Sequence, residues 1–344
     1  MPSTRPALLS IDGLCAKVPI GLGCDGCSDR PLAQAAALGL PAGAGTQLKE
    51  SMTKGTQLMD DSQVVVQDGV QGFIDLVMSE ATPERPMTLV AIAPLDNVAE
   101  ALRREPAIAE RLNLVGMHGS VFRGYGGSKS TSAQPVPEYN VLRNVPAAQA
   151  TFDAPWRSKL ITPLDTCGLV TFGRSKPSEK RRRASLAALD LAAGTALPRA
   201  PSVSTEQYAR LLASDSPLVQ TILTHYRAWY ANLPISMSKM IHSAYDPDVG
   251  STMLFDTVAV LLALPPQEHT VYLEPLKSMQ ITFDDEGFTR PHPQSPEMGE
   301  AGPPPHTNTI SVALKWKDQG LDAFRKMMTD RLVHPVPAVK SAKL

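Results

Sequence analysis

Short apolar segments alternate with amphipathic segments between residues 70 and 163, and this alternation constrains the fold more than any other sequence feature. Apolar runs of strand length occupy residues 87–92, 112–117 and 160–163, and residues with helical spacing occupy 70–79, 97–111 and 147–152. Strands that alternate with helices, with few hairpin signals between them, form parallel sheets covered by helices. The sequence therefore predicts an α/β fold with a mostly parallel, Rossmann-like sheet that is flanked by helices.

The rest of the chain extends this pattern. Residues 18–22 predict one more strand, 208–212, 219–231, 253–264 and 321–332 predict helices, and 279–283 and 308–315 predict edge strands. The 31 Pro residues are concentrated largely outside these segments. We therefore predict a single domain over residues 1–344, with a disordered insertion at 173–204, a Pro-rich loop at 291–305 and a flexible tail at 333–344.

Composition excludes several classes of protein. The 33 Lys and Arg residues are balanced by 34 Asp and Glu residues, whereas a nucleic-acid binder needs a basic surplus for its phosphate contacts. The longest apolar run, residues 258–264, is far shorter than the roughly 20 residues of a membrane-spanning helix. Four Cys residues are too few for a disulfide framework, and the first residues lack a secretory signal. The sequence thus predicts no nucleic-acid partner and no membrane partner.

Two short segments leave alternatives open. The basic run at residues 180–183 is typical of a solvated segment, and a nucleic-acid patch is the weaker interpretation. The C-terminal residues Ala342-Lys343-Leu344 are similar to the S-K-L peroxisomal signal. We therefore expect a cytoplasmic protein, with a peroxisomal location as the alternative.

Ligands of parallel sheets bind beyond the carboxyl ends of the strands. The segments that directly follow predicted strands are residues 94–97, 117–120 and 165–168. His118 could act there as an acid or base, although a lone His more often packs in a core, and Cys167 has no nearby base. Cys24 and Cys27 form a C-x-x-C pair, but no second pair completes a zinc site, so we interpret them as structural or incidental.

Three polar residues are candidates for a site. Asp256 lies in the apolar segment 253–264, where a carboxylate is costly unless it is paired or bound to a metal. The competing interpretation, slightly favoured by the residues alone, is a stabilised helix start. Glu138 and Asn140 share one face of an extended segment, opposite Tyr139, and a carboxylate with an amide suits a polyol such as a sugar. A turn whose polar side chains bind the backbone is the alternative for this pair.

Five segments carry a family resemblance together through their order and spacing. They are residues 89–99 (LVAIAPLDNVA), 115–120 (VGMHGS), 137–148 (PEYNVLRNVPAA), 254–264 (LFDTVAVLLAL) and 285–289 (DEGFT). They resemble the stretches LVAxGPLTNIA, xxMGG, AEFNxxxDPEAA and xHDPLAVAxxx and, in part, the DGxTxG hairpin of the inosine-uridine preferring nucleoside hydrolase family.

The resemblance implies a hydrolase that cleaves the N-glycosidic bond of purine or pyrimidine ribonucleosides in their catabolism, with a small ribonucleoside as partner. Family enzymes hold a Ca²⁺ ion that binds a water molecule and the ribose hydroxyls. By resemblance, Asp256 would supply a carboxylate ligand to Ca²⁺ and Asp96 a main-chain carbonyl. Glu138 and Asn140 would bind the ribose hydroxyls, and Met117 would line the pocket. The resemblance also allows a homo-oligomer.

The sequence departs from the family at its N-terminus. The family's DTDxGxDDA strand, which supplies the catalytic base, is absent, so the catalytic residue is unassigned. Residues 18–32 (VPIGLGCDGCSDRPL) instead resemble an internal IPVxxGxxxPL stretch. Phe255 stands where the family has a His. We therefore expect an N-terminally truncated or divergent member without the first strand. The alternative function is an inactive nucleoside-binding or interaction protein of the same fold.

Overall fold

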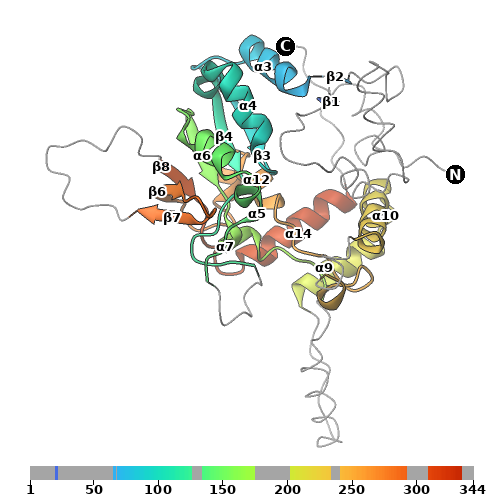
Figure 1. The fold of residues 1–344 in the computed structure, drawn as a ribbon. Helices are drawn as coiled ribbons and strands as arrows, with labels where there is room; N and C mark the ends of the chain where they lie inside the picture. Colours follow the sequence, from blue (N-terminus) through green and yellow to red (C-terminus); the bar gives the residue numbers. More distant parts are fainter. Residues whose placement is uncertain are drawn as a thin grey trace, which may run out of the picture.

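The computed structural model describes residues 20–21, 65–66, 68–125, 134–174, 202–233, 241–292 and 309–334. Its centre is a six-stranded sheet with the strand order β3-β4-β5-β8-β6-β7 (Figure 1). The strands are β3 (Met87–Ala91), β4 (Leu112–Gly116), β5 (Ser158–Ile161), β6 (Lys277–Phe283), β7 (Thr289–His292) and β8 (Thr309–Val312). Strands β3, β4, β5 and β8 are parallel, whereas β6 is antiparallel to both β8 and β7. This mostly parallel sheet confirms the predicted α/β fold.

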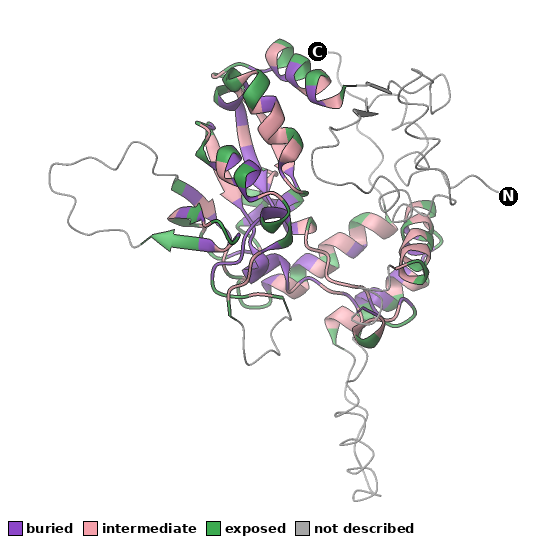
Figure 2. Ribbon diagram, in the orientation of Figure 1, coloured by how far each residue is buried: buried purple, intermediate pink, exposed green. Residues whose placement is uncertain are grey.

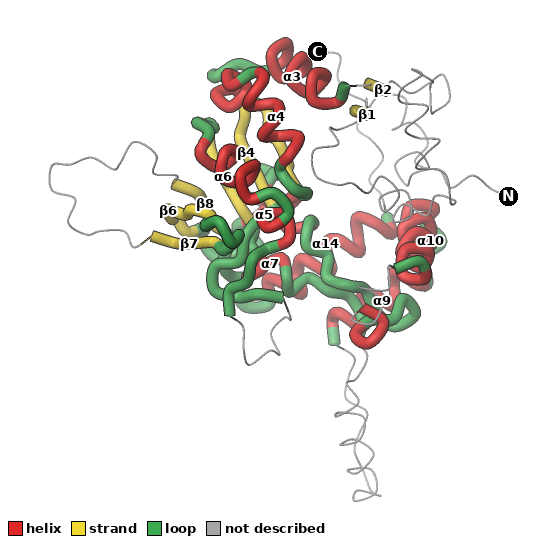
Figure 3. Tube along the Cα trace, in the orientation of Figure 1, coloured by secondary structure: helices red, strands yellow, loops and turns green. Residues whose placement is uncertain are grey.

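Helices cover both faces of the sheet (Figure 3). On one face, Leu112 and Leu114 of β4 belong to a core shared with α3 (Gly69–Glu80), α4 (Asp96–Arg104) and α6 (Val145–Asp153). On the other face, Val115 belongs to a core shared with α12 (Thr257–Leu262) and α14 (Gly320–Val333). Neighbouring residues of β4 therefore face opposite layers, as the period of a strand requires. Figure 2 shows the buried residues concentrated around this sheet.

The remaining longer helices pack against α14. Helices α9 (Val203–Leu212) and α10 (Pro217–Ala231) share a smaller apolar cluster that also includes Phe172, and α14 packs against both. Short helical turns lie at α5 (Tyr139–Leu142), α7 (Leu164–Cys167) and α13 (Pro266–His269). The helices predicted at 70–79, 147–152, 208–212, 219–231 and 321–332 are thus confirmed.

Two predicted helices have different bounds in the structure. The segment 97–111 divides into α4 and a 3-10 helix (Pro106–Arg111), because Pro106 cannot continue an α-helix and Glu105 before it has left the helical conformation, with φ −142° and ψ 86°. The segment 253–264 contains only α12. Its first residues run beside the chain after α7 instead, where the Leu254 amide donates to the Val170 carbonyl at 2.8 Å.

The strands predicted at 279–283 and 308–315 exist, but the prediction that they lie at the edge of the sheet was wrong. Strand β8 lies between β5 and β6, and β6 lies between β8 and β7, so both are interior. The hairpin that follows β6 adds β7 outside it, which makes β7 the edge on this side. Within the predicted strand at 18–22, β1 (Ile20–Gly21) pairs in parallel with β2 (Val65–Val66) in a separate two-stranded sheet beside α3.

Several predictions concern residues outside the described part of the chain. These are most of the insertion (175–201), most of the Pro-rich loop (293–305), most of the tail (335–344), Cys24, Cys27 and the basic run 180–183. The two ends of the insertion are described: Gly173 bridges Gly250, and Ser202 caps α9. No helix within the described ranges has the length and apolar character needed to cross a membrane.

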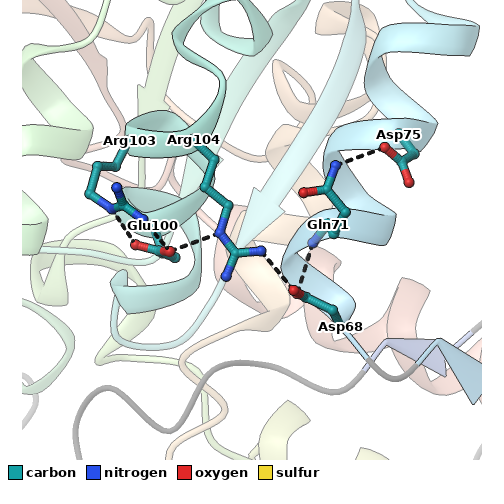
Figure 4. Close-up of polar contacts among 6 residues, drawn as sticks. All are labelled: Asp68, Gln71, Asp75, Glu100, Arg103 and Arg104. Carbon is teal, nitrogen blue, oxygen red and sulfur yellow. Dashed lines mark hydrogen bonds and ion pairs between the residues drawn. The ribbon is translucent and has the colours of Figure 1, made fainter.

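A surface network joins α3 to α4 (Figure 4). Asp68 caps α3 by accepting a hydrogen bond from the Gln71 amide at 3.0 Å. Arg104 of α4 binds Asp68 at 2.7 Å and Glu100 at 2.8 Å, and Arg103 also binds Glu100. Exposed ion pairs contribute little stability, so the apolar core remains the main connection between these helices.

Candidate functional site

The candidate site begins where β4 ends. The Met117 amide donates to the Ala91 carbonyl at 3.0 Å, which extends the contact between β3 and β4 by one residue. Met117 is buried in the core that also contains Cys167 and α12. The chain after Met117 therefore leaves the sheet at the carboxyl ends of β3, β4 and β5, where ligands of parallel sheets bind.

Glu138 and Asn140 join this region from a later segment. The Asn140 side-chain nitrogen donates to the Met117 carbonyl at 3.0 Å and lies 3.3 Å from the Met117 sulfur. The Glu138 carboxylate accepts hydrogen bonds from the amides of Gly119 at 3.3 Å and Asn140 at 2.9 Å. The structure thus brings together Met117, Glu138 and Asn140, which the sequence places about 20 residues apart.

The local conformation of this pair differs from the predicted extended segment. Glu138 is the N-cap of α5, and its carboxylate also accepts from the Val141 amide at 3.3 Å. Glu138 and Asn140 are nevertheless buried and Tyr139 is exposed. The alternative interpretation, a turn in which a polar side chain binds the backbone, is confirmed for Glu138. A contact with ribose hydroxyls stays a prediction.

Burial controls the electrostatics of Glu138. It raises the pKa of this carboxyl to about 7, although the amides of Asn140, Gly119 and Val141 favour the ionised form. The negative charge of Asp256 raises the pKa further, so Asp256 acts on Glu138 through space. At neutral pH, Glu138 therefore exists in both protonation states.

Asp256 precedes α12 instead of lying inside a helix. It occupies the N-cap position, so the predicted position at a helix start is confirmed, but its side chain makes no capping hydrogen bond, so the predicted capping was wrong. Its side chain is exposed, while the surrounding protein raises its pKa by desolvation. The preceding residue, Phe255, packs edge-on against Tyr125 with ring centres 5.9 Å apart. The Tyr125 hydroxyl accepts from the Tyr139 amide at 2.9 Å, which connects Asp256's neighbour to α5.

Asp96 lies at the margin of this group. It is the first residue of α4, and its carboxylate accepts a hydrogen bond from the Asn144 side chain at 2.5 Å. Asn144 in turn caps α6 by accepting from the Ala147 amide at 3.1 Å. Asp96 is thereby connected to the segment that carries Glu138 and Asn140.

The described residues do not by themselves fit a calcium ion. Ca²⁺ takes six to eight oxygen ligands, yet no group of three or more His, Cys, Asp or Glu side chains in the described ranges is placed to hold a metal. Glu138 is already bound to three backbone amides. Asp256 and Asp96 as calcium ligands therefore stay predictions.

Two other candidates from the sequence are unsuited to chemistry. Cys167 is fully buried, and burial raises the pKa of its thiol well above the usual value, which disfavours the nucleophilic thiolate. His118 is also fully buried, and desolvation lowers its pKa to about 4, so the ring is neutral. Its Nε2 lies 3.2 Å from the Ala93 carbonyl, and its ring packs edge-on against Phe152. The core interpretation of His118 agrees with this environment.

Two polar residues at the site had no assigned role in the sequence. Asp165 accepts hydrogen bonds from the Val121 and Phe122 amides, each at 2.9 Å, and Thr289 accepts one from the Ser120 amide at 2.9 Å. Asp165 lies in α7, the first element after β5, so the rule for strand ends identifies its location but not its partners. The β6–β7 hairpin places Thr289 at the site, and no local sequence signal relates this hairpin to residue 120.

The comparisons with known proteins agree with this architecture. A family model described as inosine-uridine preferring nucleoside hydrolase matches residues 3–313. The inosine-uridine preferring nucleoside hydrolase of Leishmania major is 36% identical over 92 residues, which cover 27% of each chain. That of Crithidia fasciculata is 31% identical over 144 residues, which cover 42% of this chain and 41% of the relative. The matched part thus spans less than half of the length of either relative.

Solved structures show the same fold. A plant nucleoside hydrolase superposes with a TM-score of 0.50 at 15% identity, over 77% of this chain and 67% of that one. An inosine-guanosine nucleoside hydrolase superposes with a TM-score of 0.50 at 16% identity, over 79% of this chain and 69% of that one.

Proposed function

Because the chain belongs to the inosine-uridine preferring nucleoside hydrolase family, we propose that it hydrolyses the N-glycosidic bond of a ribonucleoside to release base and ribose. The observation that carries this proposal is the meeting of Glu138, Asn140 and Met117 beyond the carboxyl end of β4. The family resemblance implies that Glu138 and Asn140 bind the ribose hydroxyls and that Met117 lines the pocket.

The polar groups of this site suit a sugar. A carboxyl group with a pKa of about 7 can accept a hydrogen bond from a hydroxyl group or donate one to it. The Asn140 side-chain nitrogen donates to the Met117 carbonyl, and the oxygen of the same amide group is a hydrogen-bond acceptor. We infer that this oxygen accepts a hydrogen bond from a ribose hydroxyl, while Met117 packs against the apolar face of the ring.

Asp256 supplies the charge that cleavage requires. The ribose gains positive charge as its bond to the base breaks, as in other glycosidic cleavages. A carboxylate near the sugar stabilises this charge, and the effect of Asp256 on Glu138 puts its charge within electrostatic range of the site. An attacking water molecule and its base are not assigned to described residues.

We keep Ca²⁺ in the proposal through the family resemblance, with Asp256 and the main-chain carbonyl of Asp96 as two of its ligands. The remaining oxygen ligands would have to come from outside the described residues, because these alone do not fit the ion. None of the roles given above to Glu138, Asn140 or Met117 depends on the metal.

A second candidate function is nucleoside binding without hydrolysis. It is favoured by the lack of a metal-binding acidic group in the described ranges and by the backbone contacts that occupy Glu138. The two functions share the sugar contacts and differ only in the release of ribose.

Two assays test this function. The first measures ribose release from inosine, uridine and cytidine with Ca²⁺ and with EGTA, and the second measures inosine binding by calorimetry. We expect release by the parent chain. Asn140→Ala should weaken binding by about 10-fold or more, because a sugar hydroxyl loses a buried partner. Asn232→Ala, at the end of α10, is the remote control. Binding without release would select the second function, and neither binding nor release by folded protein would refute both.

Location and assembly are further proposals. We propose a cytoplasmic protein that acts as a homo-oligomer without nucleic-acid partners, with peroxisomal import as the alternative. The residues Ala342-Lys343-Leu344 lie outside the described part of the chain. A reporter fused to residues 341–344 tests import directly, and light scattering after size-exclusion chromatography tests the assembly.

A further inference from the structure

Four successive backbone amides after β4 donate to side chains instead of to other backbone groups. The Gly119 amide donates to Glu138, the Ser120 amide to Thr289, and the amides of Val121 and Phe122 to the two oxygens of Asp165. The distances are 3.3, 2.9, 2.9 and 2.9 Å in that order. We refer to residues 119–122 as the β4 loop.

The three acceptors come from three distant parts of the fold. Glu138 precedes α5, Thr289 begins β7, and Asp165 lies in α7. Their exposed fractions are only 1%, 3% and 4%, so water has little access to replace them. A buried amide without a partner is costly, and a hydrogen bond to a carboxylate is among the stronger ones. The β4 loop is therefore held in one conformation by tertiary contacts.

The β4 loop is connected to the segment that carries the sugar-site residues. The Ser120 hydroxyl donates to the Arg123 carbonyl at 2.7 Å and accepts from the Val136 amide at 3.0 Å. Val136 lies two residues before Glu138, whose carboxylate binds the Gly119 amide. A displacement of the loop would thus move Glu138 in two ways, through the Gly119 amide that binds its carboxylate and through the Val136 backbone that precedes it.

We propose that Asp165 and Thr289 are positioning residues, which hold the β4 loop so that Glu138 and Asn140 keep the geometry that binds the sugar. This role rests on the proposed function, because it assigns the sugar contact to Glu138 and Asn140. Neither residue touches the sugar itself. The β6–β7 hairpin, at the far end of the sheet order, thereby becomes part of the site through one hydroxyl group.

The glycine at the start of the loop fits this arrangement. Gly119 has a φ of +88°, and a Cβ atom at this position would lie 2.7 Å from the Thr289 hydroxyl oxygen. Only glycine adopts such a conformation without strain and allows this close approach. The loop backbone and the Thr289 side chain are thus fitted to each other.

The first measurement is hydrogen exchange of the amides in residues 119–123, which needs no ligand and no activity. Thr289→Val keeps the shape of the side chain and removes the acceptor, whereas Thr289→Ser keeps the hydroxyl. We expect Thr289→Val to accelerate exchange at Ser120, and Asp165→Asn, which keeps only one of the two accepting oxygens, to accelerate it at either Val121 or Phe122, by about 10-fold or more. Thr289→Ser should stay near the parent. Asp68→Asn, which alters a carboxylate cap on α3, is the remote control.

The second measurement is the inosine Kd by calorimetry and, where ribose is released, KM and kcat. Positioning predicts a Kd or KM raised about 10-fold by Thr289→Val and by Asp165→Asn. Thr289→Ser should restore parent-like values, and Asp68→Asn should match the parent even if its Tm falls. Unchanged exchange in the β4 loop would overturn the proposal, as would faster exchange with unchanged affinity. Failure of the proposed function is recognised separately, because the parent chain would then neither bind inosine nor release ribose.

Discussion

Replacing Glu138 with Gln should change how the stability of this protein depends on pH. Glu138 is 1% exposed, and burial raises its pKa to about 7 from an ordinary value of 4.5. The folded protein thus binds this proton more tightly than the unfolded chain does. Between these two pKa values the folded state carries more protons, so the free energy of unfolding falls as pH rises. Below pH 4.5 both states are protonated and the penalty disappears.

The size of the effect follows from the two pKa values. A pKa difference of roughly 2.5, at about 1.4 kcal/mol for each pKa unit, gives a total penalty of about 3.5 kcal/mol when the group is fully ionised. Between pH 5 and pH 8, Glu138 alone should lower the free energy of unfolding by about 2.5 kcal/mol. In Glu138→Gln this contribution is absent. The variant also alters the contacts with the amides of Gly119, Asn140 and Val141, but that cost does not titrate with the carboxyl group.

Urea unfolding followed by Trp fluorescence at pH 5, 6, 7 and 8 measures this difference. The informative quantity is the change in unfolding free energy with pH in the parent minus the same change in Glu138→Gln. Glu100→Gln is the matched control, because Arg103 and Arg104 lower the pKa of the half-buried Glu100 to about 2, outside this range. Parallel pH profiles for the parent and Glu138→Gln would refute the assigned burial of a titrating carboxyl at this site.

Three further outcomes follow from the same structure. Gly119→Ala should lower the free energy of unfolding by about 1–2 kcal/mol in urea titrations, because a φ of +88° strains any residue with a Cβ; an unchanged midpoint would contradict this conformation. Phe152→Ala should cost about 3–5 kcal/mol, since the ring is 2% exposed and packs against Phe283 and His118; Tm shifts check it. Asp256→Asn should reduce ribose release and, by removing a charge that raises the pKa of Glu138, lessen the stability loss between pH 5 and 8; release equal to the parent would exclude Asp256 from the chemistry.

Local sequence patterns predicted much of the secondary structure. Apolar runs at residues 87–92 and 112–117 became β3 and β4. For β4 the reason is burial on both faces of the sheet, which favours apolar residues along most of the strand. The pattern was less informative where a tertiary contact competes with it. The first residues of 253–264 are apolar enough for a helix, but Leu254 instead pairs with the backbone at Val170. Helical spacing at 97–111 likewise predicted one continuous helix, whereas the α-helix ends at Arg104 and a 3-10 helix begins at Pro106.

The candidate site was predictable in part. Strand ends identified the segments that hold Met117 and Asp165, and the pairing of a carboxylate with an amide singled out Glu138 and Asn140. The prediction of an extended conformation for this pair was wrong, because the Glu138 carboxylate caps a helical turn instead. Nothing local predicted the partners of Asp165 or Thr289, since hydrogen bonds from residues 120–122 cross 44 and 169 positions of the chain.

The sequence by itself determined the alternation of strands and helices, the parallel sheet and the residue types at the ends of its strands, because these depend on local periodicity and composition. Only the tertiary structure decided that β7 closes one edge of the sheet and that Glu138, Thr289 and Asp165 share the amides of one loop. It also decided the pKa of Glu138, because desolvation depends on every segment that packs around the carboxyl group.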